Sequence, residues 1–336
     1  MSELRKDPLT NCWTVMAPER KGHPGDFVEH MDIPQTHNVC PFCPGNEALT
    51  PRELLSAVEY NRWQLRVFPN KYPIFRVEGE LIKRGKGFYD TINGIGAHEI
   101  IVYTEKHTRL MHEHDMMLFA RYFGAVKARM NDLCKDIRFA YLQFFQNHGY
   151  HSGATLVHPH GQLLALPVIP DASVQVFENT RAYYKRHKRC LICDIIDGER
   201  ADKNRIVFEN SDFVAICPYA ASSPFDICVY PKVHNHDFMG ISDTLLLRLG
   251  DIMAECFMRL SKILNEPDFQ LFIHTSPTPS VIASEPVYSR IALYYHWRIM
   301  ITPKISRLAG TERGLGFFVN TVLPEESAEL LREVSL

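Results

Sequence analysis

Two histidines two residues apart, with a glutamine just behind them, are the feature of this sequence that most strongly suggests chemistry. The stretch SGATLVHPHGQLLALPVIP, residues 152–170, contains His158, His160 and Gln162. In an extended segment, residues two apart face the same side, so these three side chains are expected to point one way. One imidazole can bind a metal while the other faces a substrate. A neutral imidazole can attack a phosphoanhydride near pH 7 and form a phosphoramidate.

The residues around this motif suit a phosphate group. The Gln162 amide is expected to donate a hydrogen bond to the phosphate, and the small Gly161 to let it approach. The upstream stretch FFQNHGYHSGAT offers further donors or space at Asn147, Gly149, Gly153 and Thr155. By itself, a histidine pair of this spacing is more often structural or metal-binding than nucleophilic. The whole set of residues favours the nucleophile.

Two CxxC pairs indicate metal or redox chemistry. In a reducing compartment such pairs are typical of metal thiolates or redox sites rather than structural disulfides. Cys40 and Cys43 are followed by Pro44 and Gly45, which disfavour the helix that a redox motif normally opens. Zinc held by this pair and two imidazoles is therefore favoured. The second pair, Cys190 and Cys193, has no such proline, and alone it leaves zinc and inert cysteines equally open.

An internal repeat links the two pairs. In each half a CxxC pair is followed by a strand, a loop histidine, a long helix and a strand that bears HPH or HWR. Equivalent halves would each hold a closed Cys2His2 set, so two structural zinc ions are expected. The sets are Cys40, Cys43, His107 and His158, and Cys190, Cys193, His234 and His296. Other histidines, at positions 98, 112, 114 and 236, are assigned to loops or the surface, and each is an alternative to the chosen loop ligand.

Helical periodicity supports the repeat and the fold class. Apolar residues recur at helical spacing from Phe119 to Leu133 and again from Leu249 to Ile263, and Ser242 is a candidate N-cap for the second helix. Short strands with one long helix per unit predict an α+β fold with largely antiparallel sheets. We expect an N-terminal domain over residues 1–175 and a C-terminal domain over residues 188–336, joined by a connector around residues 170–188.

Composition excludes several classes of function. The chain has 336 residues, and 37 basic against 39 acidic side chains give a net charge of −2. There is no overall basic field of the kind that attracts nucleic acid or anionic membranes. The first residues lack the apolar core of a signal peptide, and no run of about 18 apolar residues occurs. A cytoplasmic protein without nucleic-acid or membrane partners is expected.

Seven segments in order resemble the galactose-1-phosphate uridylyltransferase family, the nucleotidyltransferase branch of the histidine-triad superfamily. They are RKDPLTNCWTVMAPERK, CPFCPGNE, VFPNKYP, QNHGYHSGATLVHPHGQ, CLICDIIDGE, HWRIMITP and RLAGTERGLGFFVN. The resemblance implies tandem histidine-triad-like units. It also implies a ping-pong enzyme in which a histidine takes a nucleoside monophosphate from a nucleotide sugar, releases a hexose 1-phosphate and passes the nucleotide to another acceptor.

The resemblance also assigns roles to individual positions. It implies that His160 is the nucleophile, that His158 is a zinc ligand and that Gln162 stabilises the nucleotidylated histidine. It places phosphate contacts at Asn147, Gly153 and Thr155, and the last of these is a threonine where the family usually has a serine. It places nucleotide contacts at Arg20 and Asn70. The sugar-contacting positions, which in the family reach the site from the partner subunit, are Glu312 and Asn320. A homodimer is therefore expected.

Two departures leave the substrate open. Arg298 occupies a place where some family members carry a histidine of an iron site. Cys190 and Cys193 suit relatives with a second zinc, among them plant ADP-glucose phosphorylase, which shares the IHTSP, HW and REVSL features but has serines around its histidines. Three hypotheses follow: uridylyl transfer between a UDP-hexose and a hexose 1-phosphate, adenylyl transfer from ADP-glucose to phosphate, and a zinc-stabilised nucleotide-binding protein without transfer activity.

Overall fold

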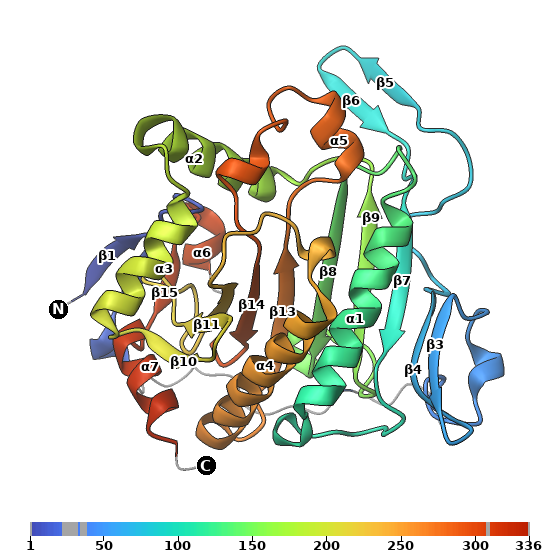
Figure 1. The fold of residues 1–336 in the computed structure, drawn as a ribbon, viewed down its shortest axis with the longest axis horizontal. Helices are drawn as coiled ribbons and strands as arrows, with labels where there is room; N and C mark the ends of the chain where they lie inside the picture. The colour runs from blue at the N-terminus through green and yellow to red at the C-terminus, as the bar shows by residue number, and fades with distance from the viewer. Residues whose placement is uncertain (1, 22–32, 34–38, 307–309, 335–336) are drawn as a thin grey trace.

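One ten-stranded sheet forms the centre of the molecule. The computed structural model describes residues 2–21, 33, 39–306 and 310–334. The strand order is β10-β11-β12-β14-β13-β8-β9-β7-β4-β3, and neighbouring strands are antiparallel throughout. Helices α1 and α4 lie side by side across one face of this sheet (Figure 1). The predicted α+β class with an antiparallel sheet is confirmed.

Each half of the chain contributes five strands and one long helix. The first half consists of β3 (Leu55–Glu59), β4 (Arg62–Pro69), β7 (Ala97–Val102), α1 (Met116–Leu133), β8 (Tyr141–His148) and β9 (His160–Leu166). The second half consists of β10 (Ile206–Glu209), β11 (Phe213–Ile216), β12 (Ile227–Pro231), α4 (Asp243–Leu264), β13 (Phe269–His274) and β14 (Arg298–Pro303). The strands of the halves do not form separate sheets, because β8 pairs with β13 and so removes two exposed edges.

A single row of residues across the sheet shows the symmetry of the halves. Phe145 of β8 pairs with Phe272 of β13 at the centre. Moving outward one strand at a time, the successive paired residues are Gln162, Ile100 and Phe68 on one side. On the other side they are Met300, Cys228 and Ile216. Residues that lie the same number of strands from the central pair are therefore pseudo-equivalent. By this relation, His160 at the start of β9 corresponds to Arg298 at the start of β14.

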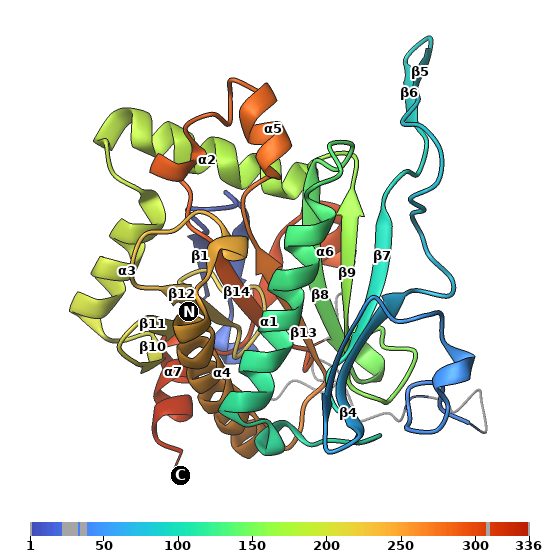
Figure 2. The same cartoon turned by 45° about the vertical axis from the view of Figure 1, so that its right-hand side comes forward.

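The remaining elements lie around this sheet. A small sheet has the order β1-β2-β15, and β5 and β6 form a hairpin that projects from the body of the molecule (Figures 1 and 2). Their bounds are β1 (Glu3–Lys6), β2 (Trp13–Met16), β15 (Phe318–Asn320), β5 (Lys83–Lys86) and β6 (Tyr89–Ile92). The further helices are α2 (Asp171–His187), α3 (Leu191–Asp202), α5 (Pro279–Ser284), α6 (Gly310–Leu315) and α7 (Pro324–Arg332). In the described part of the chain, no helix is both long and apolar enough to span a membrane.

The two long helices bury the faces that the sequence predicts. In α1 the periodic apolar residues are all buried: Phe119, Tyr122, Phe123, Val126, Met130 and Leu133. In α4 the buried ones are Leu249, Ile252, Met253, Cys256 and Leu260, while Ile263 is partly buried against the same core. The Ser242 side chain accepts a hydrogen bond from the Leu245 N–H, so the predicted N-cap is confirmed.

The segment predicted as a connector is largely helical. Helix α2 spans Asp171–His187, with Pro170 at its N-cap position and three basic residues in its last turn. A proline is tolerated where a helix begins, and cations suit the C-terminal end of the helix dipole. Helices α2 and α3 then pack on the second half of the sheet, on the face opposite to α4.

Close packing of α1 against α4 requires a glycine. A Cβ at Gly250 would lie 2.2 Å from the Met116 carbonyl oxygen, whereas one at Gly124 would meet only Leu246 Cδ1, at 3.6 Å. Gly250→Ala is expected to lower the free energy of unfolding by about 1–3 kcal/mol, because the helix backbones must separate. Gly124→Ala, the control, should be neutral or slightly stabilising. Chemical denaturation would check both, and equal stability of the two variants would contradict the close approach.

Candidate functional site

His160 and Gln162 lie on the sheet face that the long helices leave uncovered. Both belong to β9, and Gly161 between them faces α1 instead. A Cβ at Gly161 would lie 2.1 Å from the Tyr122 hydroxyl and 2.7 Å from Phe144 Cε2. The expectation that Gly161 makes room for a phosphate is therefore wrong. Strand alternation turns this position toward the helix, and the glycine is needed for packing.

The His160 imidazole is oriented by the backbone. Its Nδ1 lies 2.8 Å from the His158 carbonyl oxygen, and because a carbonyl only accepts, Nδ1 carries the proton. The lone pair is then on Nε2. The Phe42 ring meets the imidazole edge-on, with ring centroids 5.2 Å apart. The side chain is 6% exposed, and this burial lowers the pKa of His160, which favours the neutral form that a nucleophile needs.

A hydrogen-bond chain holds the Gln162 side chain. Gln162 Oε1 lies 2.8 Å from His98 Nε2. His98 Nδ1 accepts from the Ile74 N–H at 3.4 Å, and the Asn70 amide nitrogen lies beside the ring, 3.1 Å from Nε2 and 3.3 Å from Nδ1. The Ile74 donor at Nδ1 and the Gln162 oxygen at Nε2 place the proton on Nε2, which donates to Gln162 Oε1. The Gln162 NH2 group then remains for a ligand, which is the orientation that phosphate binding requires.

The assignment of His98 to a loop or the surface is wrong. His98 lies on β7 and is 8% exposed. His114 is also buried, beside Tyr103, with its Nε2 3.4 Å from the hydroxyl. The sequence signal for His98 is its two-residue spacing from Ile100 and Val102. That spacing becomes informative only when the pairing of β7 with β9 places those residues on the face of Gln162.

The predicted phosphate contacts lie on one turn after β8. Asn147 is near the end of β8, and Gly153 ends the short helix Tyr150–Ser152 with a φ of 87°. A Cβ at Gly153 would have the Asn147 amide nitrogen as its nearest neighbour, at 3.8 Å. Thr155 is exposed. Gly149 has a φ of 83°, and a Cβ there would lie 1.8 Å from the Asp268 carboxylate, so the glycine allows the close approach of the Asp268 side chain.

The first cysteine pair meets two histidines as predicted. Ligand atoms of Cys40, Cys43, His107 and His158 all lie within 4.8 Å of one another. Cys43 Sγ is 3.3 Å from His107 Nδ1 and 3.6 Å from His158 Nδ1. The other nitrogen of His158, Nε2, is 2.9 Å from the Thr104 carbonyl oxygen. Nε2 therefore carries the proton and Nδ1 offers its lone pair to a metal ion. Burial lowers the pKa of His158 to about 4, which also favours the neutral ligand form.

The second pair repeats this arrangement. Ligand atoms of Cys190, Cys193, His234 and His296 also lie within 4.8 Å of one another. Cys193 Sγ is 3.2 Å from His234 Nδ1 and 3.5 Å from His296 Nδ1. Cys190 is the N-cap residue of α3, a position that also suits a redox pair. The two imidazoles that converge on Cys193 favour a metal site instead, so each half can hold one ion.

The second half has no counterpart of the nucleophile. Arg298 occupies the position of His160, and Met300 that of Gln162. Arg298 is buried, and the sheet beside it is covered by a cluster that includes Phe177 of α2 and Ile192 of α3. In the described part of the chain, no such helix lies over the equivalent face of the first half, where His160 contacts Phe42 of the small cluster of Phe42, Phe68 and Val102. The chemistry therefore belongs to the first half.

Three predicted contacts lie around the small sheet instead. Arg20 ends a short helix after β2, Glu312 lies in α6, and Asn320 ends β15. Asn320 is buried, its amide donates to the Ala221 carbonyl, and its side-chain oxygen accepts from the Val322 N–H. Both groups are already used within the chain, so this geometry does not favour the sugar contact predicted for Asn320. Arg20 is exposed and Glu312 half-buried.

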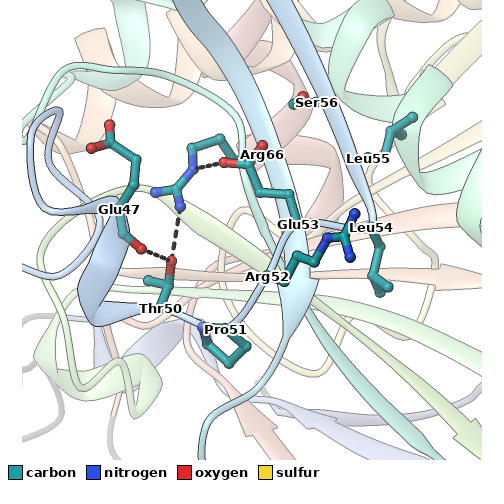
Figure 3. Close-up of a pocket in the computed structure, with 9 residues that line it drawn as sticks. All are labelled: Glu47, Thr50, Pro51, Arg52, Glu53, Leu54, Leu55, Ser56 and Arg66. Atoms are coloured by element: carbon teal, nitrogen blue, oxygen red, sulfur yellow. Dashed lines mark hydrogen bonds and ion pairs between the residues drawn. The ribbon is translucent and has the colours of Figure 1, made fainter.

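A hollow of about 480 Å³ lies between the segment that follows Cys43 and β4, and its polar residues hold these two parts of the chain together (Figure 3). Its residues include Glu47, Thr50, Glu53 and Arg66, and neither His160 nor Gln162 lines it. Arg66 is buried, forms an ion pair with Glu53 and donates to the Thr50 hydroxyl at 2.8 Å. Arg66 thereby ties the segment after Cys43 to β4.

Comparison with known proteins agrees with this geometry. The sequence model of the N-terminal domain of galactose-1-phosphate uridyl transferase matches residues 1–170. The chain is 33% identical to ADP-glucose phosphorylase of Arabidopsis thaliana over 99% of this chain and 93% of that protein. The chain belongs to the galactose-1-phosphate uridyl transferase family.

Other members of the uridyl transferase family extend over the full chain. Galactose-1-phosphate uridylyltransferase of Thermotoga maritima is 26% identical, with 100% of this chain and 99% of that protein covered. The crystal structure of an Arabidopsis thaliana ADP-glucose phosphorylase with bound ADP-glucose is similar, with a TM-score of 0.84, 31% identity and both chains fully covered. The family and the histidine-triad type of fold inferred from the sequence are confirmed.

Loss of a metal ligand is expected to cost both metal and stability. Cys43→Ser and Cys193→Ser should each release about one metal equivalent per chain and destabilise the fold by several kcal/mol, because metal binding contributes folding free energy. Cys12→Ser is the control, since Cys12 is exposed and outside both ligand groups. Elemental analysis of the purified protein and thermal denaturation would measure the two effects. Full metal content in Cys43→Ser would contradict the first ligand set.

Proposed function

We propose that this protein transfers a nucleoside monophosphate from a nucleotide sugar through a covalent bond to His160. The observation that carries the proposal is the orientation of His160. Its Nδ1 proton is held by the His158 carbonyl, so the Nε2 lone pair is fixed in place, and the Gln162 amide lies two residues away on the same face. A fixed nucleophile with a nearby donor supplies positioning and charge stabilisation, which phosphoryl transfer requires.

The reaction has two balanced steps. First, His160 Nε2 attacks the α-phosphorus of the nucleotide sugar, a P–N bond forms, the pyrophosphate P–O bond breaks, and the sugar 1-phosphate leaves with the electron pair. Then an oxygen of the acceptor phosphate attacks the same phosphorus, the P–N bond breaks, and Nε2 recovers its lone pair. The His160 Nδ1 proton stays on the ring throughout, facing the His158 carbonyl. The Gln162 NH2 group is placed to donate to the phosphate in both steps.

We take ADP-glucose and inorganic phosphate as the first substrates to test. The support is the similarity over the whole chain to Arabidopsis thaliana ADP-glucose phosphorylase, together with the second Cys2His2 group, which the sequence resemblance associates with that branch of the family. A second candidate is uridylyl transfer from a UDP-hexose to a hexose 1-phosphate. It is supported by the HPHGQ motif, by the matching domain and by relatives named galactose-1-phosphate uridylyltransferase.

We propose zinc as the ion at both Cys2His2 groups. Two thiolates and two imidazoles form the donor set of structural zinc sites, and four protein ligands leave no open position for substrate. An ion held by Cys40, Cys43, His107 and His158 would fix the backbone at His158, and with it the carbonyl oxygen that orients His160. Because Arg298 stands in the second half where His160 stands in the first, an ion at the second group would support only the fold.

We propose that the active form is a homodimer. Arg20 lies in the short helix after β2 and Glu312 in α6, and Asn320 of the small sheet contacts Ala221 of the second half rather than the face that bears His160. A partner subunit that brings this region to the site of the first would let Arg20 and Glu312 contact the nucleotide sugar.

Trapping the covalent intermediate tests the central step. Incubation with ADP-glucose and no acceptor is expected to add the mass of one AMP moiety to the intact protein, and peptide mass spectrometry should place it on His160. A UMP moiety from a UDP-hexose would identify the second candidate. His160→Ala should show no adduct from any donor. An adduct retained in His160→Ala would show that another residue is the nucleophile. No adduct in the metal-loaded wild-type protein would favour the nucleotide-binding protein without transfer activity.

Loss of the His98 hydrogen bond should slow formation of the His160 adduct only because Gln162 is no longer held in place. Gln162→Ala is expected to slow adduct formation by about 10- to 1,000-fold, because one transition-state donor is deleted. His98→Leu should slow it by about 10- to 100-fold, and His98→Gln, which keeps a donor near the Nε2 position, should restore most of the rate.

The double variant distinguishes positioning from a general structural effect. If His98 acts by orienting Gln162, adding His98→Leu to Gln162→Ala should cause little further loss in single-turnover experiments. Independent, multiplying losses would show that His98 has another role.

A further inference from the structure

The turn that follows β8 carries one of the predicted phosphate contacts, Gly153. It runs from Gly149 to Gly153, and these two glycines have φ values of 83° and 87°. Within the turn, the Ser152 hydroxyl donates to the Gly149 carbonyl at 2.8 Å, and the Gly153 N–H donates to the Tyr150 carbonyl at 3.0 Å. These bonds close the turn on itself, so its place relative to β9 depends on contacts with other parts of the chain.

Asp268, the residue before β13, holds the middle of this turn. Its Oδ2 accepts from the His151 N–H at 2.7 Å. The side chain is buried, and its Oδ1 lies where a Cβ at Gly149 would come within 1.8 Å, so the carboxylate fits closely against the turn. The backbone of Asp268 is itself fixed, because its carbonyl accepts from the Lys304 N–H at 2.7 Å. A hydrogen bond to an ionised acceptor is stronger than one between neutral groups.

Gln270, on β13, holds the end of the same turn. Its amide donates to the Ser152 carbonyl at 3.0 Å. In the sheet, Gln270 pairs with Asn147, a predicted phosphate contact. Phe269 pairs with His148, and their rings are stacked with centroids 4.9 Å apart. Three consecutive residues of the second half therefore contact the end of β8 and the turn that follows it.

This turn lies beside the nucleophile. Phe145 pairs with Gln162, and Asn147, two residues further along β8, is on the same face and continues toward the start of β9 at His160. A reacting phosphorus atom must be held about 3–3.5 Å from the attacking nitrogen, and a misplacement of about 1 Å can cost about 100-fold in rate. A shift of the turn that binds the phosphate would therefore slow transfer without any change at His160.

We propose that Asp268 and Gln270 are positioning residues for nucleotidyl transfer. They act through the His151 N–H and the Ser152 carbonyl, and they place the phosphate-binding turn against the site of the first half. The inference rests on the proposed transfer through His160. The second half, which has no counterpart of the nucleophile, thereby takes part in catalysis through β13.

The pseudo-symmetry of the sheet supplies a matched control. Gln143 lies two residues before Phe145 as Gln270 lies two residues before Phe272, and both glutamines are half-buried. The Gln143 amide also joins the halves, because it donates to the Ile273 carbonyl at 3.2 Å, but it does not bind the turn. Replacing either glutamine by alanine removes one side-chain bond between the halves, so the two variants should lose similar stability.

Single-turnover labelling of His160 tests the assignment. Full-length, metal-loaded protein would be mixed with saturating ADP-glucose, or with UDP-glucose if only that donor labels the wild-type protein, and followed by intact mass spectrometry. Asp268→Ala and Gln270→Ala should each slow adduct formation by about 10- to 100-fold, because the turn loses its place. Gln143→Ala should keep the wild-type rate. Asp268→Asn keeps an oxygen that can accept from the His151 N–H, so it should restore most of the rate.

Two further measurements separate positioning from stability. Thermal denaturation should show similar losses in Gln270→Ala and Gln143→Ala. Hydrogen exchange of the peptide that contains residues 149–155 should be faster in Gln270→Ala and Asp268→Ala but unchanged in Gln143→Ala.

The outcomes distinguish this inference from the mechanism on which it rests. A wild-type labelling rate or unchanged exchange in Gln270→Ala would overturn the positioning role alone. An equal loss of rate in Gln143→Ala would also overturn it, because the loss would then follow stability rather than the turn. Absence of any adduct in the wild-type protein would refute the proposed transfer through His160, and this inference with it.

Discussion

The pairing of β8 with β13 is the constraint on which the rest of the structure depends. It joins the two halves at Phe145 and Phe272, so that ten strands share one register and one pair of faces. One face is then wide enough for α1 and α4 to lie together, and a single apolar core extends beneath both helices. Because the register continues from strand to strand, each side chain on the other face is placed by its number of steps from the central pair. His160 and Gln162 owe their position to this arrangement.

Strand alternation in β9 places a packing residue on one face of the sheet and the chemically active residues on the other. His160 and Gln162 face the uncovered side, while Gly161 allows Tyr122 and Phe144 to pack against the backbone. The preceding turn adds a second constraint. His158 offers Nδ1 to the first Cys2His2 group and its carbonyl to His160 Nδ1, so the residue that can hold a metal ion also fixes the tautomer of the neighbouring imidazole. A change in the metal site would therefore alter the nucleophile through one peptide group.

The two halves show how one scaffold accommodates different roles. Both keep the Cys2His2 group, the long helix and the strand order. In the first half, His160, Gln162 and His98 form a polar row on the face opposite to α1. The corresponding residues of the second half are Arg298, Met300 and Asp226, and α2 and α3 cover most of the equivalent surface. The repeat thus preserves the elements that stabilise the fold, while the residues on the second face have diverged.

The sequence by itself determined those features that depend on local spacing and on residue type. Helical periodicity identified both long helices, the Ser242 cap followed from its position before an apolar series, and the repeat grouped the eight cysteine and histidine ligands into two sets of four. Ordered motifs identified the family. Tertiary structure decided everything that depends on which strands are neighbours. The fusion of two expected sheets into one, the packing role of Gly161, the burial of His98 beside Gln162 and the internal use of Asn320 all arise from register between segments far apart in the chain. A single sequence contains no direct record of that register, because an isolated strand specifies its two faces but not its partner.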